Sequence, residues 1–377
     1  MIQIESFNSG HFERGIEYKY FVPNKINDTW SWNTLEINQL LEKAAAKLGA
    51  LNSFSHLVPN IDLFILLHVT KEAVCSSRIE GTRTNIDEAL LPLEDVQPER
   101  RNDWEEVNNY ISALNDAIKR LDELPICSRL IKMAHKRLLK NVRGKYKLPG
   151  EFRTSQNWIG GTSIADAKFI PPHNSLLPEL MSDLEYFLND VKMPALIKIA
   201  IAHYQFETIH PFLDGNGRIG RLLITLFLVK EKLLDLPLLY LSTYFEKNRN
   251  LYYDNLNNVR DKNDLIQWIK YFLVGIEQTA THSAETLSQI LAFKSETETY
   301  IQHNYGRRSS LALTLFHSML ERPFTKVDEA AKICNVSYKA ANDLVRKMQN
   351  DGYLVETTGH NRNRMYCFQK YLQIFDN

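Results

Sequence analysis

The chain has 377 residues, of which 44% are hydrophobic and 24% charged, a composition typical of a globular protein with room for two or three domains. Its 45 basic and 45 acidic side chains cancel, so the chain as a whole is not a binder of polyanions, and a nucleic-acid role would need a local patch. No metal-ligand or redox spacing, basic leader or long apolar run is present, which predicts a cytoplasmic protein with reduced thiols at Cys75, Cys127, Cys334 and Cys367.

The first third of the chain predicts an N-terminal segment followed by helices. Residues 1–34 are rich in asparagine, aromatic and charged side chains, and we expect them to wrap over the core, with an extended piece at residues 18–23. Apolar periodicity predicts a helix over residues 34–49, for which Thr34 is a suitable N-cap.

A second helix is predicted from about Asn60 to Glu80. Gly81 suits the position after its C-cap, where a left-handed backbone conformation is common. Ser76 and Glu80 lie one helical turn apart and therefore share a face. Spacing alone favours a polar helix end with a solvated glutamate.

The middle of the chain predicts two more helices, over residues 103–121 and 128–140, and then a break in the pattern. Residues 149–161 read as a short strand that enters a Gly-Gly turn, and residues 169–172 close it. A β-hairpin within an otherwise helical domain is therefore expected between residues 142 and 173. In most proteins such a hairpin is simply a surface loop.

Residues 209–221 form the most informative stretch, Ile-His-Pro-Phe-Leu-Asp-Gly-Asn-Gly-Arg-Ile-Gly-Arg. An apolar helix precedes it, Pro211 and the glycines end that helix, and a second apolar helix begins near Gly217 or Arg218. Residues 215–217 therefore lie at a helix N-terminus. Unpaired N–H groups, the positive end of the helix dipole and glycines that permit close approach make this turn an anion site.

Charged side chains complete this stretch as a phosphate site. Arg218 and Arg221 are three residues apart and could hold phosphates with both guanidinium groups. Asp214 would repel a phosphate unless a cation such as Mg²⁺ lay between them, and His210 is the nearby base that works at neutral pH. Each feature alone is more often a turn, a helix cap or a solvated face, but their joint occurrence favours an active site.

The same stretch resembles the signature of the Fic family, because every position that defines the signature is filled: His210, Pro211, Phe212, Asp214, Gly215, Asn216, Gly217, Arg218 and Arg221. The resemblance implies an enzyme that transfers AMP from ATP to a hydroxyl group of a protein. It also implies a mainly α-helical fold, a Fic-type core that carries a β-hairpin flap.

The resemblance gives roles to three other regions. Ser76 and Glu80 match an inhibitory motif, in which the glutamate would pair with Arg221 and compete with the γ-phosphate of ATP. The hairpin would be the flap that holds the target segment as an added strand, through Trp158, Ile159 and Gly160. The run Gly150-Glu151-Phe152-Arg153 matches the lead-in to that flap.

Beyond the motif helix, a tyrosine pair precedes a further helical stretch. By composition Tyr252 and Tyr253 are equally well explained as core aromatics, whereas the resemblance places them on the adenine and ribose side of the nucleotide. On the same basis Arg260 is a third candidate ATP-binding residue.

A long helix over residues 264–298 leads to a pattern of helix, turn, helix and hairpin that predicts a winged helix-turn-helix domain. We expect an N-terminal segment at 1–100, a catalytic domain at 101–280, and a linker helix with the winged helix at 281–377. From Arg307 onward the chain has eleven basic and seven acidic residues. DNA binding through residues 337–347, with Arg362 and Arg364 on the wing, is one interpretation, and protein contact or dimerisation is the other.

The sequence thus predicts a protein adenylyltransferase that uses ATP with Mg²⁺ on Asp214, His210 as the base, and Glu80 as a built-in inhibitor. Its partners would be ATP and a target protein, with a second copy of the chain and DNA as further candidates. Two alternatives stay open. The same site could remove AMP from protein, or the chain could be a DNA-binding regulator with a nucleotide-sensing domain.

Overall fold

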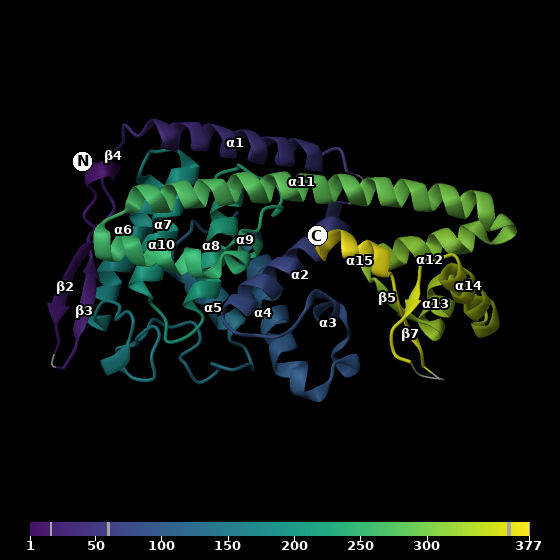
Figure 1. The fold of residues 1–377 in the computed structure, drawn as a ribbon. Coiled ribbons are helices and arrows are strands. Elements are labelled where there is room, and N and C mark those ends of the chain that lie inside the picture. Colours follow the sequence, from purple (N-terminus) through teal and green to yellow (C-terminus); the bar gives the residue numbers. More distant parts are fainter. Residues whose placement is uncertain (16, 59–60, 360–362, 377) are drawn as a thin grey trace.

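The computed structural model describes residues 1–15, 17–58, 61–359 and 363–376, and its fold is mainly α-helical, as expected. Two long helices, α1 (Leu35–Ser55) and α11 (Leu265–Asn304), lie side by side along one side of the molecule (Figure 1). The helices that carry the motif lie beneath one end of α11, and a small C-terminal region lies at its other end. The helix α11 continues through residue 280, so the predicted domain boundary falls inside one continuous helix.

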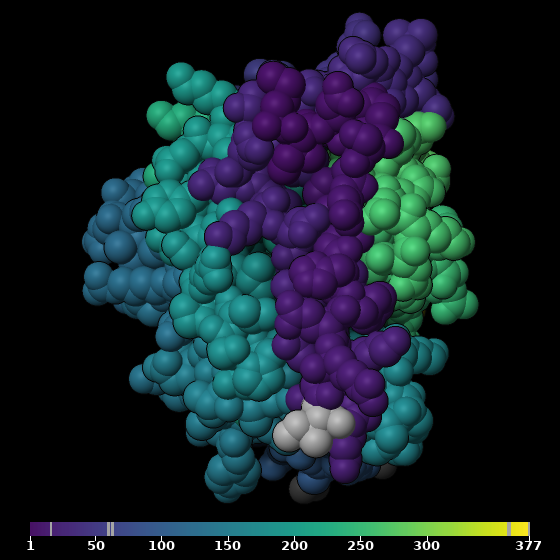
Figure 2. Space-filling view, turned by 90° about the vertical axis from the view of Figure 1, so that its left-hand side faces the viewer, coloured from purple at the N-terminus to yellow at the C-terminus, as the bar shows by residue number. Residues whose placement is uncertain are grey.

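The described residues of the N-terminal segment form four short strands. The strands β1 (Ile2–Gln3) and β4 (Trp30–Ser31) pair in parallel, whereas β2 (Gly10–Arg14) and β3 (Lys19–Pro23) form an antiparallel hairpin. The extended piece expected at residues 18–23 is confirmed as β3. Figure 2 shows the segment running down one face of the molecule, over the helices beneath it, as the predicted wrap requires.

Two adjacent helices form the centre of the core. In α7 (Ala195–Ile209) every residue from Leu196 onward is buried, because its side chains are apolar nearly all round and fit only in a protein interior. The helix α8 (Asn216–Lys230) packs against it. The others around them are α2 (Ile61–Ile79), α3 (Ile86–Leu90), α4 (Arg101–Lys119), α5 (Ser128–Leu138), α6 (Leu177–Asp190), α9 (Ser242–Lys247) and α10 (Arg249–Lys262).

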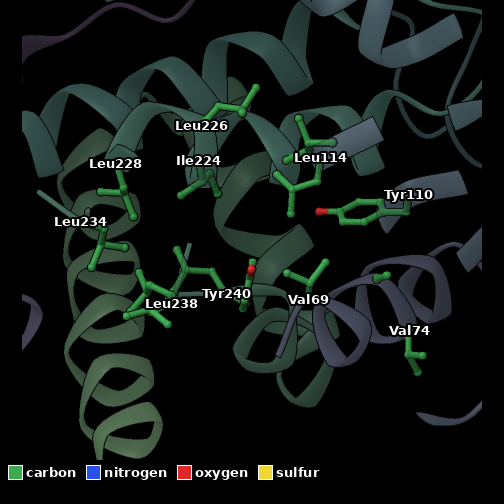
Figure 3. Close-up of a cluster of buried hydrophobic side chains, with 14 of the residues drawn as sticks. Val69, Val74, Tyr110, Leu114, Ile224, Leu226, Leu228, Leu234, Leu238 and Tyr240 are labelled. Carbon is green, nitrogen blue, oxygen red and sulfur yellow. The ribbon is translucent and has the colours of Figure 1, made fainter. Parts of the chain in front are cut away.

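Apolar side chains from distant parts of the sequence meet in this core. Figure 3 shows Val69 and Val74 of α2, Tyr110 of α4 and Ile224 of α8 together in one cluster of buried side chains. The helices expected at 34–49, 60–80, 103–121 and 128–140 are present as α1, α2, α4 and α5, although Asn60 itself lies outside the described residues. The helix α1 continues past Gly49 to Ser55, because Leu48 and Leu51 are buried and outweigh the low helix propensity of one glycine.

The expected β-hairpin at residues 142–173 is present only as one antiparallel bridge between Ile159 and Phe169. Gly160 and Gly161 both have positive φ, of 69° and 77°, and form the turn that the sequence predicts. The rest of the segment forms no strand ladder, because side-chain hydrogen bonds from Arg153 and Asn157 join it to the motif carbonyls of His210 and Phe212, and Arg153 also bonds the Pro172 carbonyl.

The C-terminal region has the order of elements that the sequence predicts. Up to residue 367, its described residues form three helices and an antiparallel sheet of order β5-β7-β6. The elements are α12 (Ser309–Glu321), β5 (Phe324–Lys326), α13 (Val327–Cys334), α14 (Tyr338–Asn350), β6 (Val355–Glu356) and β7 (Met365–Cys367). The winged-helix assignment and DNA binding stay predictions, and Arg362 lies outside the described residues.

A last helix, α15 (Gln369–Asp376), follows the sheet and was not predicted. It turns back toward the centre of the molecule and lies beside α2 (Figure 1). The four cysteines are buried and unpaired. Among the described residues, no helix combines the length and the apolar character that a membrane span requires.

Candidate active site

The motif forms a tight loop between α7 and α8. The helix α7 ends at Ile209, and its C-cap residue His210 has a left-handed backbone with φ 50° and ψ 60°. The helix α8 starts at Asn216, one residue before the predicted start. The Asn216 side chain closes the loop, since it accepts a hydrogen bond from the Phe212 N–H and donates one to the Phe212 carbonyl, both at 2.8 Å. The first-turn N–H groups of α8 therefore face outward from a fixed loop.

His210 is suited to accept a proton. Its Nδ1 lies 3.3 Å from the Glu207 carbonyl oxygen, so we assign the hydrogen to Nδ1, which leaves Nε2 as an acceptor. Burial lowers the pKa of His210 to about 4, and the imidazole is consequently neutral at physiological pH. A neutral imidazole with a free nitrogen is the form that a general base requires.

His135 of α5 packs against the motif loop. Its ring stacks on Phe212 at a centroid distance of 3.7 Å. Its Nδ1 accepts from the Gly150 N–H at 2.8 Å, so Nε2 carries the hydrogen and donates to the Asp214 carbonyl at 2.9 Å. Burial lowers the pKa of His135 to about 4, which keeps this bridge between the motif and the flap lead-in neutral.

Arg153 joins the flap to the motif. Its guanidinium is buried and donates to the carbonyls of His210, at 3.0 Å, and of Pro172 in the closing segment of the flap. Its own N–H donates to the Pro211 carbonyl at 2.9 Å. Of the predicted flap residues, Trp158 is exposed, Ile159 forms the bridge to Phe169, and Gly160 lies in the turn.

The first motif arginine, Arg218, is bound by Glu106 of α4. Its Nη1 donates to Glu106 Oε2 at 2.9 Å, and both side chains are buried, with exposures of 3% and 1%. Arg143 also pairs with Glu106, at 3.3 Å. The Nη2 of Arg218 lies 3.4 Å from Asp214 Oδ1, so this arginine orients the acidic residue of the motif.

The second motif arginine, Arg221, is bound by residues at the end of α2, as the resemblance implied. Its Nε donates to Ser76 Oγ at 2.9 Å, and its Nη2 donates to the Ser76 carbonyl at 2.8 Å and to Glu80 Oε1 at 2.7 Å. Glu80 follows directly after α2. Burial acts to raise its pKa, but the charge and hydrogen bond of Arg221 outweigh this effect, and the net pKa is lowered.

The Glu80 carboxylate also covers the start of α8. A Cβ added at Gly217 would lie 2.2 Å from Glu80 Oε1, so only glycine allows this approach. The carboxylate thus occupies both the guanidinium of Arg221 and the helix N-terminus, the two groups expected to bind phosphate.

Glu72, one turn before Ser76 and two turns before Glu80, fixes the position of α2. Its Oε1 accepts from Tyr110 Oη of α4 at 2.9 Å and from Ser242 Oγ of α9 at 2.5 Å, and its Oε2 accepts from the Ser242 N–H at 3.1 Å. Glu72, Ser76 and Glu80 are spaced by four residues and lie on one face. We call residues 72–81, which carry the predicted inhibitory motif, the inhibitory segment.

Glu207, one turn before His210, is a buried carboxylic acid close to Arg221. Its Oε1 has no hydrogen-bond partner among the residues that the structure describes. A Cβ at Gly220 would lie 2.3 Å from it, which places the carboxyl group against α8. Burial raises the pKa of Glu207 to about 7.

The residues expected on the adenine side have different environments. Tyr252 is buried and donates to His203 Nε2 at 2.8 Å, and His203 Nδ1 in turn donates to the Gly220 carbonyl, so Tyr252 supports α8 from behind. Tyr253 is partly exposed. The buried guanidinium of Arg260 stacks on Phe169 of the flap, 4.0 Å from the ring centroid. Their contact with a nucleotide stays a prediction.

Asp214 fits the role of a magnesium ligand. Its carboxylate is 35% exposed, beside the N-terminus of α8, and a Cβ at Gly144 would lie 2.5 Å from Oδ2. The described part of the chain has no cluster of three or more His, Cys, Asp or Glu side chains that could hold a metal. One carboxylate is nevertheless enough for Mg²⁺, which takes its remaining ligands from phosphates and water.

Sequence reasoning missed Glu106, His135, Glu72 and Glu207. A signal existed for two of them. Glu106 falls in register with the buried residues Tyr110, Ala113 and Ala117 of α4, and His135 lies on the apolar stripe of α5. A polar side chain on an apolar helix face needs a partner, which only the fold identifies.

A helical core in which a glycine-rich loop, two arginines and the Asp214 carboxylate converge at a helix N-terminus has the groups that typically bind nucleotide phosphates. Two family models match the chain, the Fic/DOC family N-terminal region over residues 38–119 and the Fic/DOC family itself over residues 125–228. The chain therefore carries a Fic/DOC family domain, preceded by the N-terminal region of that family.

Relatives in sequence carry adenylyltransferase names. A probable protein adenylyltransferase of Aquifex aeolicus is 26% identical over 292 residues, which cover 76% of this chain and 82% of that protein. Protein adenylyltransferase fic-1 of Caenorhabditis briggsae is 33% identical over 129 residues, covering 33% of this chain. The match spans only 24% of that animal protein's length.

Solved structures show the same fold. A Fic family protein from Desulfovibrio desulfuricans superposes with a TM-score of 0.58 at 19% identity and covers 89% of this chain and 96% of its own. Fic-1 from C. elegans superposes with a TM-score of 0.51 at 21% identity, covering 68% of this chain and 74% of its own.

Proposed function

We propose that this protein transfers AMP from ATP to a hydroxyl side chain of a target protein and that Glu80 inhibits the reaction in the resting state. The observation that carries the proposal is the position of the Glu80 carboxylate, 2.7 Å from Arg221 Nη2 and against Gly217. A carboxylate there occupies the groups that would bind a phosphate. Names of the relatives give independent support for the activity.

The chain's own groups account for the reaction. Phosphates of ATP would lie on the N-terminus of α8 between Arg218 and Arg221, after Glu80 has moved away. The target hydroxyl oxygen attacks the α-phosphorus and its proton passes to His210 Nε2. The bond from the α-phosphorus to the bridging oxygen breaks, and pyrophosphate leaves with the electron pair. Asp214 would hold a Mg²⁺ ion that arrives with ATP, and its charge would offset that of the phosphates.

The flap supplies the surface for the target. The β3 N–H of Phe21 donates to the Ile170 carbonyl at 2.9 Å, so β3 covers the outer edge of residues 169–171. The edge at residues 157–159 carries the exposed Trp158 and is the better place for a target strand. Because Arg153 joins this segment to His210, a strand bound there would lie at a fixed position relative to the base.

A second candidate is removal of AMP from protein at the same site. The Glu80 side chain is 32% exposed, so it has room to orient a water molecule near His210. AMP transfer and AMP removal can be told apart experimentally, because the first adds label to the protein and the second releases it. Loss of AMP from a pre-labelled protein, at a rate that depends on Glu80, would favour removal.

Transfer of label from α-labelled ATP to protein tests the proposal. We expect Glu80→Gly to raise labelling roughly 10- to 100-fold, the size of a typical coupling energy, because Arg221 and Gly217 become available to ATP. Adding His210→Ala should then lower labelling by about 10²- to 10⁴-fold, as expected for loss of a general base.

Glu179→Gln, which changes an exposed glutamate on α6, is the matched control and should leave labelling unchanged. Labelling that is equal in the wild-type chain and in Glu80→Gly would rule out the inhibitory role. Labelling that survives in the double variant would remove His210 from the mechanism.

A further inference from the structure

The helix α2 has contacts at both ends, and only its C-terminal end belongs to the active site. Over its last turns, Glu72 and Ser76 bind Tyr110, Ser242 and Arg221, which places Glu80 on the site. Its N-terminal half instead contacts the C-terminal region of the chain. We call that region, residues 309–376, the C-terminal domain.

The first of these contacts is made by α15. Phe375 is fully buried, and its ring lies 6.2 Å from Phe64 and 5.5 Å from His68, both on α2. Lys71, one turn further along α2, donates a hydrogen bond to the Phe375 carbonyl. The α15 contact therefore joins the last helix of the chain to the helix that ends at Glu80.

The second contact lies just beyond the inhibitory segment. Residues 82–100 lead from Glu80 to α4, and Asp95 in this stretch pairs with Lys326 at the end of β5. The Lys326 Nζ lies 2.8 Å from both carboxylate oxygens, and both side chains are only about a quarter exposed, 25% and 24%. This β5 contact holds the C-terminal domain to the chain on the other side of Glu80.

A cleft accompanies the β5 contact. It measures about 1000 Å³ and lies between residues 85–97 and the sheet of the C-terminal domain, where Lys326 lines it. A cleft of this size leaves room for the domain to shift against the residues that follow the inhibitory segment. A second cleft, of about 690 Å³, is lined by α2, α3, α9 and α11, including Cys75 and Arg78 of the inhibitory segment, so this part of α2 is not packed tightly on that face.

We infer that the C-terminal domain is part of the inhibitory device, with Phe375 and the Asp95–Lys326 pair as positioning residues that keep Glu80 on Arg221. This inference rests on the proposed inhibitory role of Glu80. A ligand or partner that displaced the domain would release α2 and free the phosphate site.

A displacement of the C-terminal domain can reach Glu80 through α2, which would move as one rigid helix. The helix α2 has 19 residues and is roughly 28 Å long, so a shift at its N-terminal half moves its C-terminal end as well. Coupling between sites of this kind typically changes an activity by roughly 5- to 150-fold.

Charge reversal at the β5 contact tests the inference. We expect Asp95→Lys and Lys326→Asp each to raise labelling by at least about 5-fold, because like charges then face each other and the contact opens. Combining the two restores the pair in reversed order and should return labelling to the wild-type level. Phe375→Ala should raise labelling in the same way through the α15 contact.

Placing the same substitutions in a Glu80→Gly chain separates a positioning role from a general structural one. Because no inhibitory carboxylate remains, they should add nothing there. Lys25→Glu, which breaks an exposed pair with Glu179 far from α2, is the matched control and should have no effect. Provided that the Glu80→Gly chain transfers AMP, single reversals that leave labelling unchanged, or that raise it equally in the Glu80→Gly chain, would overturn the inference.

A second readout does not depend on the reaction. Amide hydrogen exchange at residues 76–82 should speed up in Asp95→Lys and in Lys326→Asp and return to normal in the charge-swapped chain. If Glu80→Gly fails to transfer AMP but the exchange responds, the proposed activity is wrong and the coupling stands. If the exchange does not respond, the coupling is wrong whatever the activity.

Discussion

The two motif arginines, one turn apart on α8, are each held by a glutamate from another helix, yet the two pairs differ in their exposure to solvent. Arg218 and Glu106 are both buried, and Arg143 joins them. Arg221 is equally buried, but its partner Glu80 is 32% exposed and follows the end of a helix. The Glu106 pair is thus enclosed by the core, whereas the Glu80 pair lies where solvent and ligands reach it.

This difference separates a permanent contact from an exchangeable one. A buried carboxylate cannot leave its arginine without exposing an uncompensated charge to the protein interior. A carboxylate at the rim can move into water while a phosphate takes its place on the same guanidinium. Glu207 adds a third case, a buried carboxylic acid near Arg221 whose Oε1 has no partner among the described residues.

The largest stability effect is expected from breaking the buried pair. Glu106→Gln should lower the free energy of unfolding by about 3–5 kcal/mol, because Arg218 keeps its charge and loses its main partner. Urea unfolding measures this, with Glu179→Gln as the exposed control. A loss below about 1 kcal/mol would mean that Arg218 is compensated elsewhere.

A smaller and pH-dependent effect is expected at Glu207. Burial raises its pKa to about 7, above the ordinary value of 4.5, so the folded chain holds a proton between these values that the unfolded chain has released. Stability should therefore fall as pH rises from 5 to 8, by roughly 2–3 kcal/mol more in the wild-type chain than in Glu207→Gln. Urea unfolding at the two pH values checks this, and identical slopes would show that the carboxylate is ionised in the fold.

The smallest effect is expected from the rim pair. Glu80→Gln should change the free energy of unfolding by no more than about 1 kcal/mol, since the carboxylate is partly solvated and Arg221 keeps its bonds to Ser76. Its consequence should appear with ATP. Saturating ATP should stabilise Glu80→Gln by about 2.7 kcal/mol at 100 times Kd, and the wild-type chain less. Equal thermal shifts would mean that Glu80 does not compete with the nucleotide.

The sequence predicted most of the helices and much of the site. The stretch from His210 to Arg221 was readable because its residues are neighbours in the chain, and the helix start that exposes Gly217 follows from glycine and apolar periodicity. Glu80 was found only through resemblance, since spacing alone favoured a solvated helix end. Glu106 and Glu72 were missed because Arg218 and Ser242, which they bind, lie more than 100 residues away.

The flap is a case in which the sequence predicts more regular structure than the fold contains. A strand pattern and a Gly-Gly turn predicted a β-hairpin, but only the bridge between Ile159 and Phe169 forms. The turn was predicted correctly because it depends on backbone preferences of the two glycines. The missing ladder depends on Arg153, whose hydrogen bonds to His210 and Pro172 fix the segment by other means.

By itself the sequence determined the helical class and the loop between two helices that carries the motif, and it predicts phosphate binding and the base there, because short-range spacing and backbone preferences dictate where these residues lie. Only the tertiary structure decided which carboxylate each arginine meets, how deeply each pair is buried, and that α15 and β5 contact the chain on either side of Glu80. Such pairings depend on how distant helices pack, and packing is a property of the whole core rather than of any local pattern.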